Sequence, residues 1–293
     1  MTNTDESVAV LGLGAMGHAM AASALRAGIA TIVWNRTPEA AQDLKAMGAE
    51  VATTAADAAR NAAIVVTMVT DGAAVLSIAR DEGALAAMRP GGIWAQMSTI
   101  GVIETERIID LVRAERPDVI LVDAPVAGSR EPAERGELTI LASGPDAARH
   151  RVGPLFDALG QRTLWAGPVG AGSRLKLVNN VWLAFAAEAI ASSLAVAHHL
   201  GLSTETVTSA LDDGPLMSTW QAAKLRRIAN GDYSPQFSLS LALKDVHLAL
   251  EVTRGEQLPA LSALAGEWER AVSAGLGDLD LTAVTRVLGA PDE

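Results

Sequence analysis

The chain has 293 residues, of which 49% are hydrophobic and 19% charged, so it is long enough for two domains and too apolar to be disordered. Its net charge of -11 argues against general nucleic-acid binding, because phosphate recognition needs clustered Lys and Arg and the 23 basic residues form no run. The absence of cysteine excludes disulfides, thiol catalysis and thiolate metal sites.

The polar start MTNTDES lacks the basic and apolar regions of a secretory signal, so we expect a cytosolic protein. One segment, 177–197, is about long enough to span a bilayer. It carries Asn179, Asn180 and Glu188, and the cost of placing the Glu188 carboxylate in hydrocarbon argues against insertion. We therefore expect no membrane partner.

Residues 8–17, VAVLGLGAMG, predict a short buried strand, a glycine-rich turn and a helix that runs to Arg26. A second strand is predicted at 30–34. Gly-x-Gly-x-x-Gly between a strand and a helix is typical of a dinucleotide site, because it lets a pyrophosphate approach the helix N-terminus. The predicted cofactor contacts here are Gly12, Leu13, Gly14, Ala15, Met16 and Gly17.

The end of the second predicted strand indicates which dinucleotide is preferred. NAD sites usually have a carboxylate there to bind the ribose 2′-hydroxyl. This chain has Asn35, Arg36 and Thr37 instead, and Arg36 can hold a 2′-phosphate by charge-assisted hydrogen bonds. The sequence therefore predicts NADP(H), with Arg36 as the main discriminator.

Further strands alternate with helices, which predicts a parallel α/β sheet. Strands are predicted at 63–69 and 92–97, and Met68, Val69, Ser98 and Thr99 in the loops after them are candidate cofactor contacts. The run 119–128 ends in a Pro-containing turn, a strand resumes at 137–144, and a helix through Leu155 and a strand near 162–165 are expected to complete a sheet. Beyond Leu200 the patterns are helical.

A long helix is predicted from Ser173, as its N-cap, to about Leu200. Lys176, Asn179 and Asn180 stand at i, i+3 and i+4, so they share one face. The rest of the helix is apolar almost all round, which predicts burial on every side. A buried ammonium needs partners, although from spacing alone Lys176 could equally extend to solvent.

Four blocks in this order resemble the β-hydroxyacid dehydrogenase family, namely GLGAMG (12–17), DAPVAGSREPAERGEL (123–138), GAGSRLKLVNN (170–180) and KDVHLAL (244–250). They look most like its glyoxylate/succinic semialdehyde reductase branch. The resemblance implies a Rossmann domain, 1–168, and an all-helical domain, 169–293, joined by the long helix at about 173–200. It also implies a homodimer or homotetramer that acts on a small carbonyl compound or hydroxy acid.

The resemblance also assigns roles to residues. Lys176 becomes the catalytic lysine, with Asn179 and Asn180 as its neighbours, while Lys244 is placed at the cofactor and Asp245 at the substrate. The loop 126–129 becomes the substrate-anchoring turn. Most members have Ser-Gly-Gly in this turn, whereas this chain has Ala127, Gly128 and Ser129, followed by Arg130. Because Ala127 has no hydroxyl, the departure affects which substrate is expected.

In the implied reduction, the Lys176 ammonium donates a proton to the carbonyl oxygen, and partial burial is expected to lower its pKa from about 10.4. We therefore expect reduction near neutral pH and oxidation at alkaline pH. Phe237 and Trp220 are candidates to line the pocket. No metal site is expected, because the five histidines have no carboxylate at ligand spacing.

Two other functions remain open from the sequence. An imine reductase shares the layout, and Ala127 would suit a neutral cyclic imine, but such enzymes typically lack the lysine that is present here as Lys176. A cofactor-binding module without catalysis is the other alternative, and the intact group of Lys176, Asn179 and Asn180 argues against it.

Overall fold

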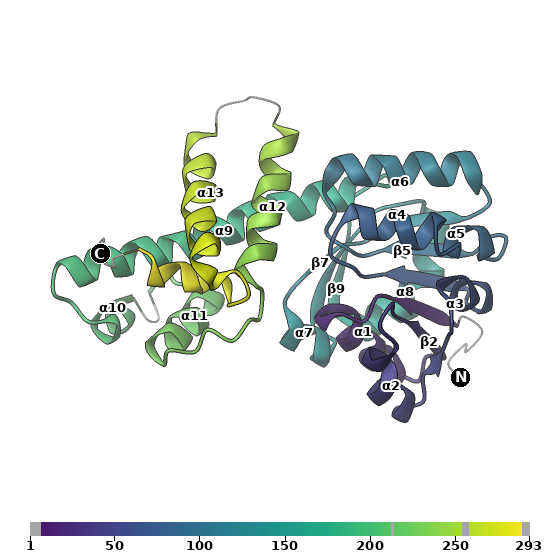
Figure 1. Ribbon diagram of the computed structural model, residues 1–293, viewed down its shortest axis with the longest axis horizontal. Helices are drawn as coiled ribbons and strands as arrows, with labels where there is room; N and C mark the ends of the chain where they lie inside the picture. The colour runs from purple at the N-terminus through teal and green to yellow at the C-terminus, as the bar shows by residue number, and fades with distance from the viewer. Residues whose placement is uncertain (1–6, 212–213, 254–257, 289–293) are drawn as a thin grey trace. The chain divides into compact units, whose positions relative to one another are not determined.

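The computed structural model of the chain describes residues 7–211, 214–253 and 258–288 (Figure 1). These residues form two compact units that divide inside one helix, between Lys176 and Leu177. Strands β1 to β9 all belong to the first unit, whereas the second is built mainly from helices. Residues 1–6, which carry most of the expectation about a secretory signal, lie outside the described residues.

The first unit contains the parallel sheet that the alternating pattern predicts. Its strands are β1 (Val8–Leu11), β2 (Thr31–Trp34), β3 (Glu50–Val51), β4 (Ile64–Thr67), β5 (Ile93–Gln96) and β6 (Ile120–Asp123). Their order is β3-β2-β1-β4-β5-β6, and every pairing between them is parallel. This is the strand order of a Rossmann fold, so the predicted fold class is confirmed.

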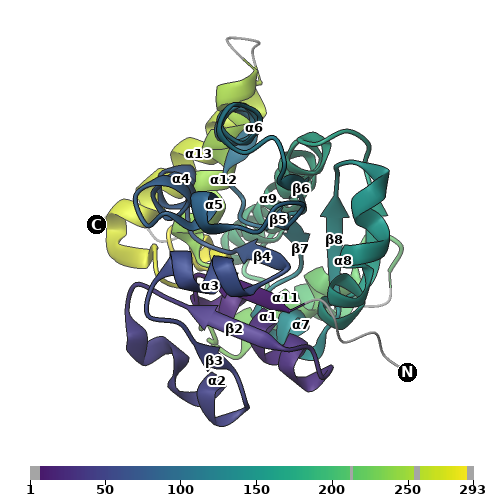
Figure 2. The same ribbon diagram turned by 90° about the vertical axis from the view of Figure 1, so that its right-hand side faces the viewer.

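Both faces of this sheet are buried, which explains why its strands read as unbroken apolar runs. In β1, Val8 and Val10 belong to one core and Ala9 and Leu11 to the other. The first core is covered by α1 (Ala15–Arg26), α2 (Gln42–Ala46) and α8 (Asp146–Leu159). The second is covered by α3 (Ala55–Asn61), α4 (Gly72–Arg80), α5 (Ala84–Ala87) and α6 (Gly101–Glu115), which are labelled in Figure 2.

The last three strands of the unit form a sheet of their own. β7 (Val126–Ala127), β8 (Leu138–Ala142) and β9 (Gly160–Trp165) form a separate three-stranded sheet. β7 pairs antiparallel with β8, because the short α7 (Arg130–Arg135) between them is no full crossover. The 14-residue α8 does provide a crossover, and β8 and β9 are parallel.

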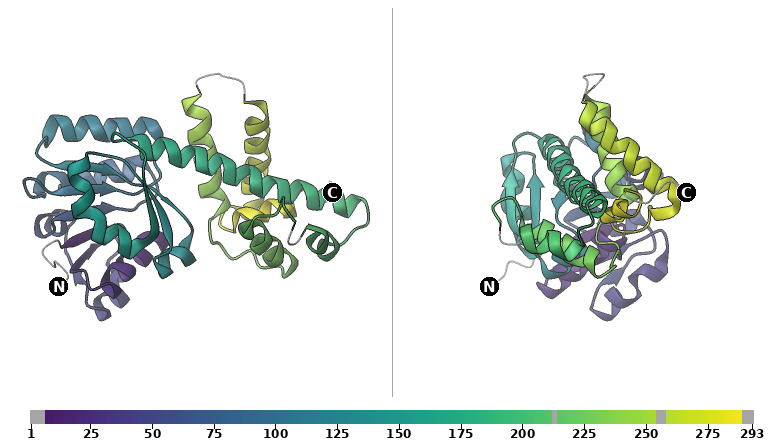
Figure 3. Two further views of the ribbon diagram at one scale, coloured as in Figure 1. Left: turned by 180° about the vertical axis from the view of Figure 1, so that it is seen from behind. Right: turned by 90° about the vertical axis from the view of Figure 1, so that its left-hand side faces the viewer.

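The second unit is helical, as predicted. It contains most of α9 (Ala171–His199), then α10 (Thr204–Leu211), α11 (Thr219–Ala229), α12 (Leu239–Val252) and α13 (Pro259–Ala271), followed by helical turns at Val272–Leu276 and Leu281–Arg286. α12 and α13 pack side by side (Figures 1 and 3). Trp268 of α13 is fully buried in the core, where its indole N–H donates to Glu188 Oε2 of α9 (3.0 Å).

Two expectations about α9 are wrong. The helix begins at Ala171, so Ser173 lies inside its first turn and is not the N-cap. The helix is also not buried all round: Val178 is 66%, Trp182 81%, Phe185 39% and Val196 59% exposed. These four residues, spaced as one helix face, are called the α9 stripe below. By length and composition alone, α9 is long and apolar enough to cross a membrane. Within the protein, 33% of its most apolar stretch is buried.

Candidate functional site

The glycine-rich turn has the shape that a dinucleotide pyrophosphate requires. Gly12 has a φ of +99°, and a Cβ there would lie 2.5 Å from the Met68 carbonyl oxygen. A Cβ at Gly17 would lie 2.0 Å from the Gly12 carbonyl oxygen, so α1 can approach the turn only without a side chain. A Cβ at Gly14 would meet no atom within 4 Å, which leaves open space beside the N-terminus of α1.

Asn35 at the end of β2 supports this turn. Its Oδ1 accepts the Leu13 N–H (2.9 Å), and its Nδ2 donates to the Thr37 carbonyl (3.0 Å). The Asn35 side chain thus joins the glycine turn to the segment after β2. Arg36 and Thr37 are exposed in that segment, and Ala15 and Met16 are exposed and half-buried in the first turn of α1.

The candidate contacts after β4 and β5 lie at the same carboxyl edge of the sheet. Met68, Val69 and Thr99 are half-buried there, and the Met68 N–H donates to the Leu11 carbonyl (3.0 Å). Ser98 is fully buried, and its hydroxyl oxygen accepts the Val69 N–H (2.8 Å). Ser98 therefore ties β4 to β5, and the structure does not support it as a cofactor contact.

We expect Gly14→Ala to leave folding unchanged and to raise the Kd for NADPH about tenfold or more, because its methyl group would occupy the open space beside the α1 N-terminus. Isothermal titration with the cofactor would measure this. Gly153→Ala is the matched control, because a Cβ at this α8 position also meets nothing within 4 Å. Equal Kd values for both variants would contradict a cofactor position at Gly14.

A polar network lies between α9 and α12 in the second unit. Asn179 Nδ2 donates to Asn180 Oδ1 (3.0 Å), and Asn180 Nδ2 donates to Asp245 Oδ2 (2.5 Å). The other carboxylate oxygen, Asp245 Oδ1, lies 3.0 Å from Lys244 Nζ. Although this oxygen accepts no hydrogen bond of good geometry, the ammonium is close enough for ion pairing.

This network fixes the orientation of the Asn180 amide, with its oxygen toward Asn179 and its NH₂ toward Asp245. Asn180 is 4% and Asp245 3% exposed. Lys176 lies one turn before Asn180 on α9 and is 8% exposed, so most of this residue is buried and its side chain is not spread over the protein surface. α9 therefore brings together the three residues that the spacing placed on one face.

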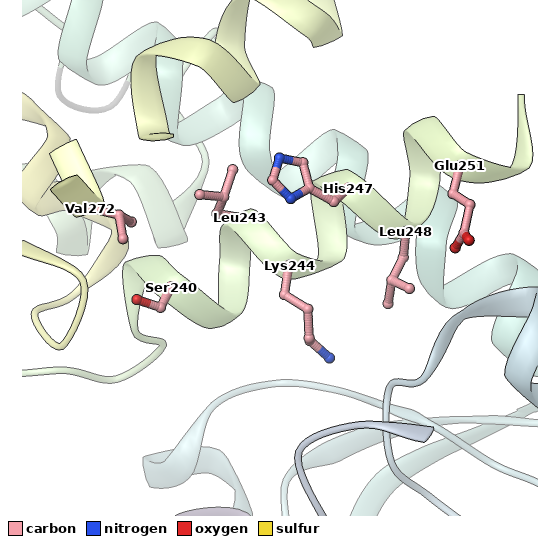
Figure 4. A pocket seen from close by; sticks show the side chains of 7 residues that line it. All are labelled: Ser240, Leu243, Lys244, His247, Leu248, Glu251 and Val272. Atoms are coloured by element: carbon pink, nitrogen blue, oxygen red, sulfur yellow. The ribbon is translucent and has the colours of Figure 1, made fainter. Parts of the chain in front are cut away.

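A hollow of about 430 Å³ lies along one face of α12 (Figure 4). Its lining is mostly apolar, and Lys244 contributes a side chain that extends away from the helix in Figure 4. The lining residues are Ser240, Leu243, Lys244, His247, Leu248, Glu251 and Val272. Neither Lys176 nor Asn180 is among them. Of the predicted site residues, the hollow therefore includes Lys244 but not the group of Lys176, Asn179 and Asn180.

The predicted substrate turn is the end of β7 and the start of α7. Ala127 is half-buried and pairs with Thr139 of β8. Gly128 has a φ of +133°, and a Cβ there would lie 2.7 Å from Leu138 Cδ2. Ser129 is the N-cap of α7, but its hydroxyl makes no capping bond. Arg130 forms an exposed ion pair with Glu134 (2.7 Å), which gives its guanidinium a partner on α7 itself.

Phe237 and Trp220 both pack against the core of the second unit. Sequence patterns do not indicate the buried ion pair beside them, in which Lys224 Nζ lies 2.8 Å from both Asp280 Oδ1 and Asp280 Oδ2. Asp280 Oδ2 also accepts the Phe237 N–H (3.3 Å), and Lys224 Nζ lies 5.6 Å from the Trp220 ring centre. Burial lowers the pKa of Lys224, and the Asp280 carboxylate opposes this.

Comparison with known proteins places this fold and these motifs. Residues 7–167 match the family model of the NAD binding domain of 6-phosphogluconate dehydrogenase. Residues 170–288 match that of the NAD-binding domain of NADP-dependent 3-hydroxyisobutyrate dehydrogenase. The chain is 34% identical to glyoxylate/succinic semialdehyde reductase 1 of Arabidopsis thaliana, over 94% of this chain and 96% of the relative.

Solved structures of similar fold support the same family. A 3-hydroxyisobutyrate dehydrogenase from Salmonella typhimurium superposes with a TM-score of 0.87 at 28% identity, covering 97% of this chain and 100% of that one. An imine reductase from Pseudomonas sp. has the same identity, 28%, and covers 96% and 98%, but its TM-score is lower, 0.62. The chain therefore belongs to the β-hydroxyacid dehydrogenase family and is an NAD(P)-dependent dehydrogenase or reductase that acts on CH–OH groups.

Proposed function

We propose that the protein uses NADPH to reduce a small aldehyde or keto acid of the semialdehyde or glyoxylate type, or runs the reverse oxidation. One observation carries the proposal: a largely buried lysine, Lys176, stands one turn from an asparagine whose amide is held in place by Asp245. A buried ammonium is costly and suits proton transfer more than solubility.

The cofactor supplies hydride, and the chain's own residues supply binding and the proton. The glycine turn 12–17 holds the pyrophosphate at the start of α1. Lys176 donates a hydrogen bond and then its proton to the carbonyl oxygen, and Asn180 orients the lysine or that oxygen. The backbone N–H groups of Gly128 and Ser129 hold the substrate carboxylate where Ala127 offers no hydroxyl.

Succinic semialdehyde, glyoxylate, tartronate semialdehyde, methylmalonate semialdehyde and several cyclic imines form the panel that tests this function. NADPH consumption by the purified protein at neutral pH is the measurement. We expect turnover of at least one of the aldehydes, all of which carry a carboxylate. Turnover of imines alone would overturn the proposal, and binding of NADPH without any turnover would favour a module without catalysis.

The imine reductase remains the second candidate because of Ala127. Its methyl group removes a polar contact that an anionic substrate would use, and an imine reductase is among the similar structures. The buried Lys176 favours the carbonyl substrates, because it provides both a proton donor and a positive charge near an acid.

We further propose that the protein is a cytosolic homodimer or homotetramer in which a second copy covers the α9 stripe. Exposed apolar patches of this kind mark association surfaces. Inside α9, Asn180 bonds to Asp245 and Glu188 to Trp268, and such polar contacts suit a helix packed against protein better than one in lipid.

Trp182→Glu is expected to convert the oligomer to monomers at micromolar concentration, because it places a charge at the centre of the stripe. Light scattering after size-exclusion chromatography measures the mass. Leu216→Glu is the control, since Leu216 is 85% exposed and lies outside α9. A monomeric wild-type protein, or an oligomer that survives Trp182→Glu, would contradict the proposed interface.

A further inference from the structure

The buried carboxylate of Asp123, at the end of β6, binds the first turn of α9. Asp123 Oδ1 accepts the Ser173 hydroxyl (2.6 Å), and Oδ2 accepts the Ser173 N–H (2.8 Å). The Ser143 hydroxyl lies 3.0 Å from the same Oδ2, and Ser143 Oγ accepts the Gly172 N–H (2.9 Å). Side chains from β6 and from just after β8 thus satisfy two N–H groups that the helix start leaves open.

This anchor explains how α9 begins. A carboxylate near a helix N-terminus is stabilised by the helix dipole, so the helix start is held by the Asp123 carboxylate and not by a capping side chain from Ser173. The approach is close, because a Cβ at Gly172 would lie 2.2 Å from the Leu141 carbonyl oxygen. Gly170, with a φ of +93°, provides the turn into the helix.

The anchor is buried and fully hydrogen-bonded. Asp123 is 1%, Ser143 0% and Ser173 3% exposed. Burial raises the pKa of the Asp123 carboxyl, and hydrogen bonds from Ser173 and Ser143 oppose that rise. The 2.6 Å contact with the Ser173 hydroxyl is typical of a hydroxyl that donates to an ionised carboxylate.

The anchor lies on the Lys176 side of the helix. Ser173 and Lys176 are three residues apart on one face of α9, so the residue that Asp123 binds is a direct neighbour of the lysine on the helix surface. Two other charged groups at this end of α9, Arg174 and Glu106, form an exposed ion pair with each other (3.2 Å). Asp123 and Lys176 are both buried at the start of this helix, whereas the ion pair of Arg174 and Glu106 is exposed.

We propose that Asp123 is a positioning residue for the reaction: by holding the first turn of α9 it fixes the place of Lys176, and its negative charge keeps that lysine protonated. The inference rests on the proposed role of Lys176. Asp123, Ser173 and Lys176 all belong to the first unit, which ends at Lys176 inside α9.

Two substitutions separate position from charge. Asp123→Asn keeps the shape of the side chain, removes its charge and replaces one of the two carboxylate oxygens with an NH₂ group, which cannot accept a hydrogen bond from Ser173. Ser173→Ala removes one bond to the carboxylate and keeps the charge. Thr54→Ala is the matched control, because the Thr54 hydroxyl oxygen accepts an N–H in the first turn of α3, from Asp57 (3.0 Å).

The first readout is catalysis with whichever panel aldehyde the wild type reduces. We expect Asp123→Asn to lower kcat at least about tenfold, with the Kd for NADPH within about twofold, because small misplacements of a catalytic group are costly. Ser173→Ala should lower kcat less, and Ser173→Thr, which keeps the hydroxyl, should restore it. A kcat for Asp123→Asn within about twofold of wild type would overturn the proposal.

The second readout needs no substrate. The chain has four lysines, Lys45, Lys176, Lys224 and Lys244, so acetylation by trace acetic anhydride can be followed for each by mass spectrometry. Relative to the exposed Lys45, Lys176 should react about fivefold faster in Asp123→Asn than in wild type at pH 8, because loss of the charge increases its unprotonated fraction. Ser173→Ala controls for loosening, and its Lys176 should react nearly as in wild type.

Equal Lys176 labelling in wild type and Asp123→Asn would overturn the role of the charge. If no panel compound is reduced, the proposed function fails while the labelling still tests Asp123. If Asp123→Asn does not fold, kcat values for Ser173→Ala and Ser173→Thr decide: a loss in the first that the second restores supports the proposal, and equal values overturn it.

Discussion

Replacing Lys176 with alanine is expected to lower kcat for carbonyl reduction about a thousandfold, since a positioned proton donor contributes that order of rate enhancement. The Kd for NADPH should stay within about twofold, because the glycine turn that we propose as the pyrophosphate site lies at β1 and α1. Steady-state kinetics and cofactor titration on the same preparation would measure both quantities.

Lys176→Arg separates charge from proton transfer. Arginine keeps the positive charge but does not release a proton at working pH, so kcat should remain low while KM for an anionic aldehyde recovers in part. Lys45→Ala, at an exposed lysine on α2, is the control and should behave as wild type. A loss of only a few fold in Lys176→Ala would remove this lysine from the chemistry.

Arg36→Ala is expected to lower the ratio of kcat/KM for NADPH to that for NADH about a hundredfold. Charge-assisted hydrogen bonds contribute about 1.5–3 kcal/mol each, and a guanidinium can make two with the 2′-phosphate. Arg36 is exposed directly after β2, whereas Asn35 before it accepts the Leu13 N–H, so of these two residues we expect Arg36 to bind the phosphate.

The comparison of both cofactors with one aldehyde would measure this ratio. Arg113→Ala serves as control, because Arg113 is an exposed arginine on α6 that forms an ion pair within the same helix, with Asp110 (3.1 Å). An unchanged ratio in Arg36→Ala would show that another group selects the cofactor, with the exposed Thr37 as the next residue to replace.

Local patterns in the sequence were sufficient to predict most of the helices and strands of the fold. Glycines at 12, 14 and 17 between a strand and a helix act within six residues of one another, and the structure places each where its missing side chain matters or leaves space. The apolar runs predicted β1, β2, β4, β5 and β6 because strands buried on both faces need no alternation. The i, i+3, i+4 spacing placed Lys176, Asn179 and Asn180 on one face of α9.

Contacts between distant residues were decided only by the tertiary structure. Ser173 looked like an N-cap because its residue type favours that position, yet Asp123, 50 residues earlier, provides the acceptor. The aspartate inside the apolar run VILVDAPVAG was the one available signal, since a carboxylate in a buried strand needs donors. Asn180 likewise finds Asp245, 65 residues away, and Lys224 finds Asp280.

Two features of the fold were left open by the sequence for the same reason. The apolar composition of the α9 stripe predicts that it is covered, but it does not identify the chain that covers it. The apolar runs of β8 and β9 predict strands, but they do not identify the sheet to which the strands belong. Apolar periodicity predicts which face of an element is stabilised by burial. Because the hydrophobic effect is not directional, any apolar partner can provide that burial. Only three-dimensional packing selects the partner, because it depends on shape and on hydrogen bonds between segments far apart in the chain.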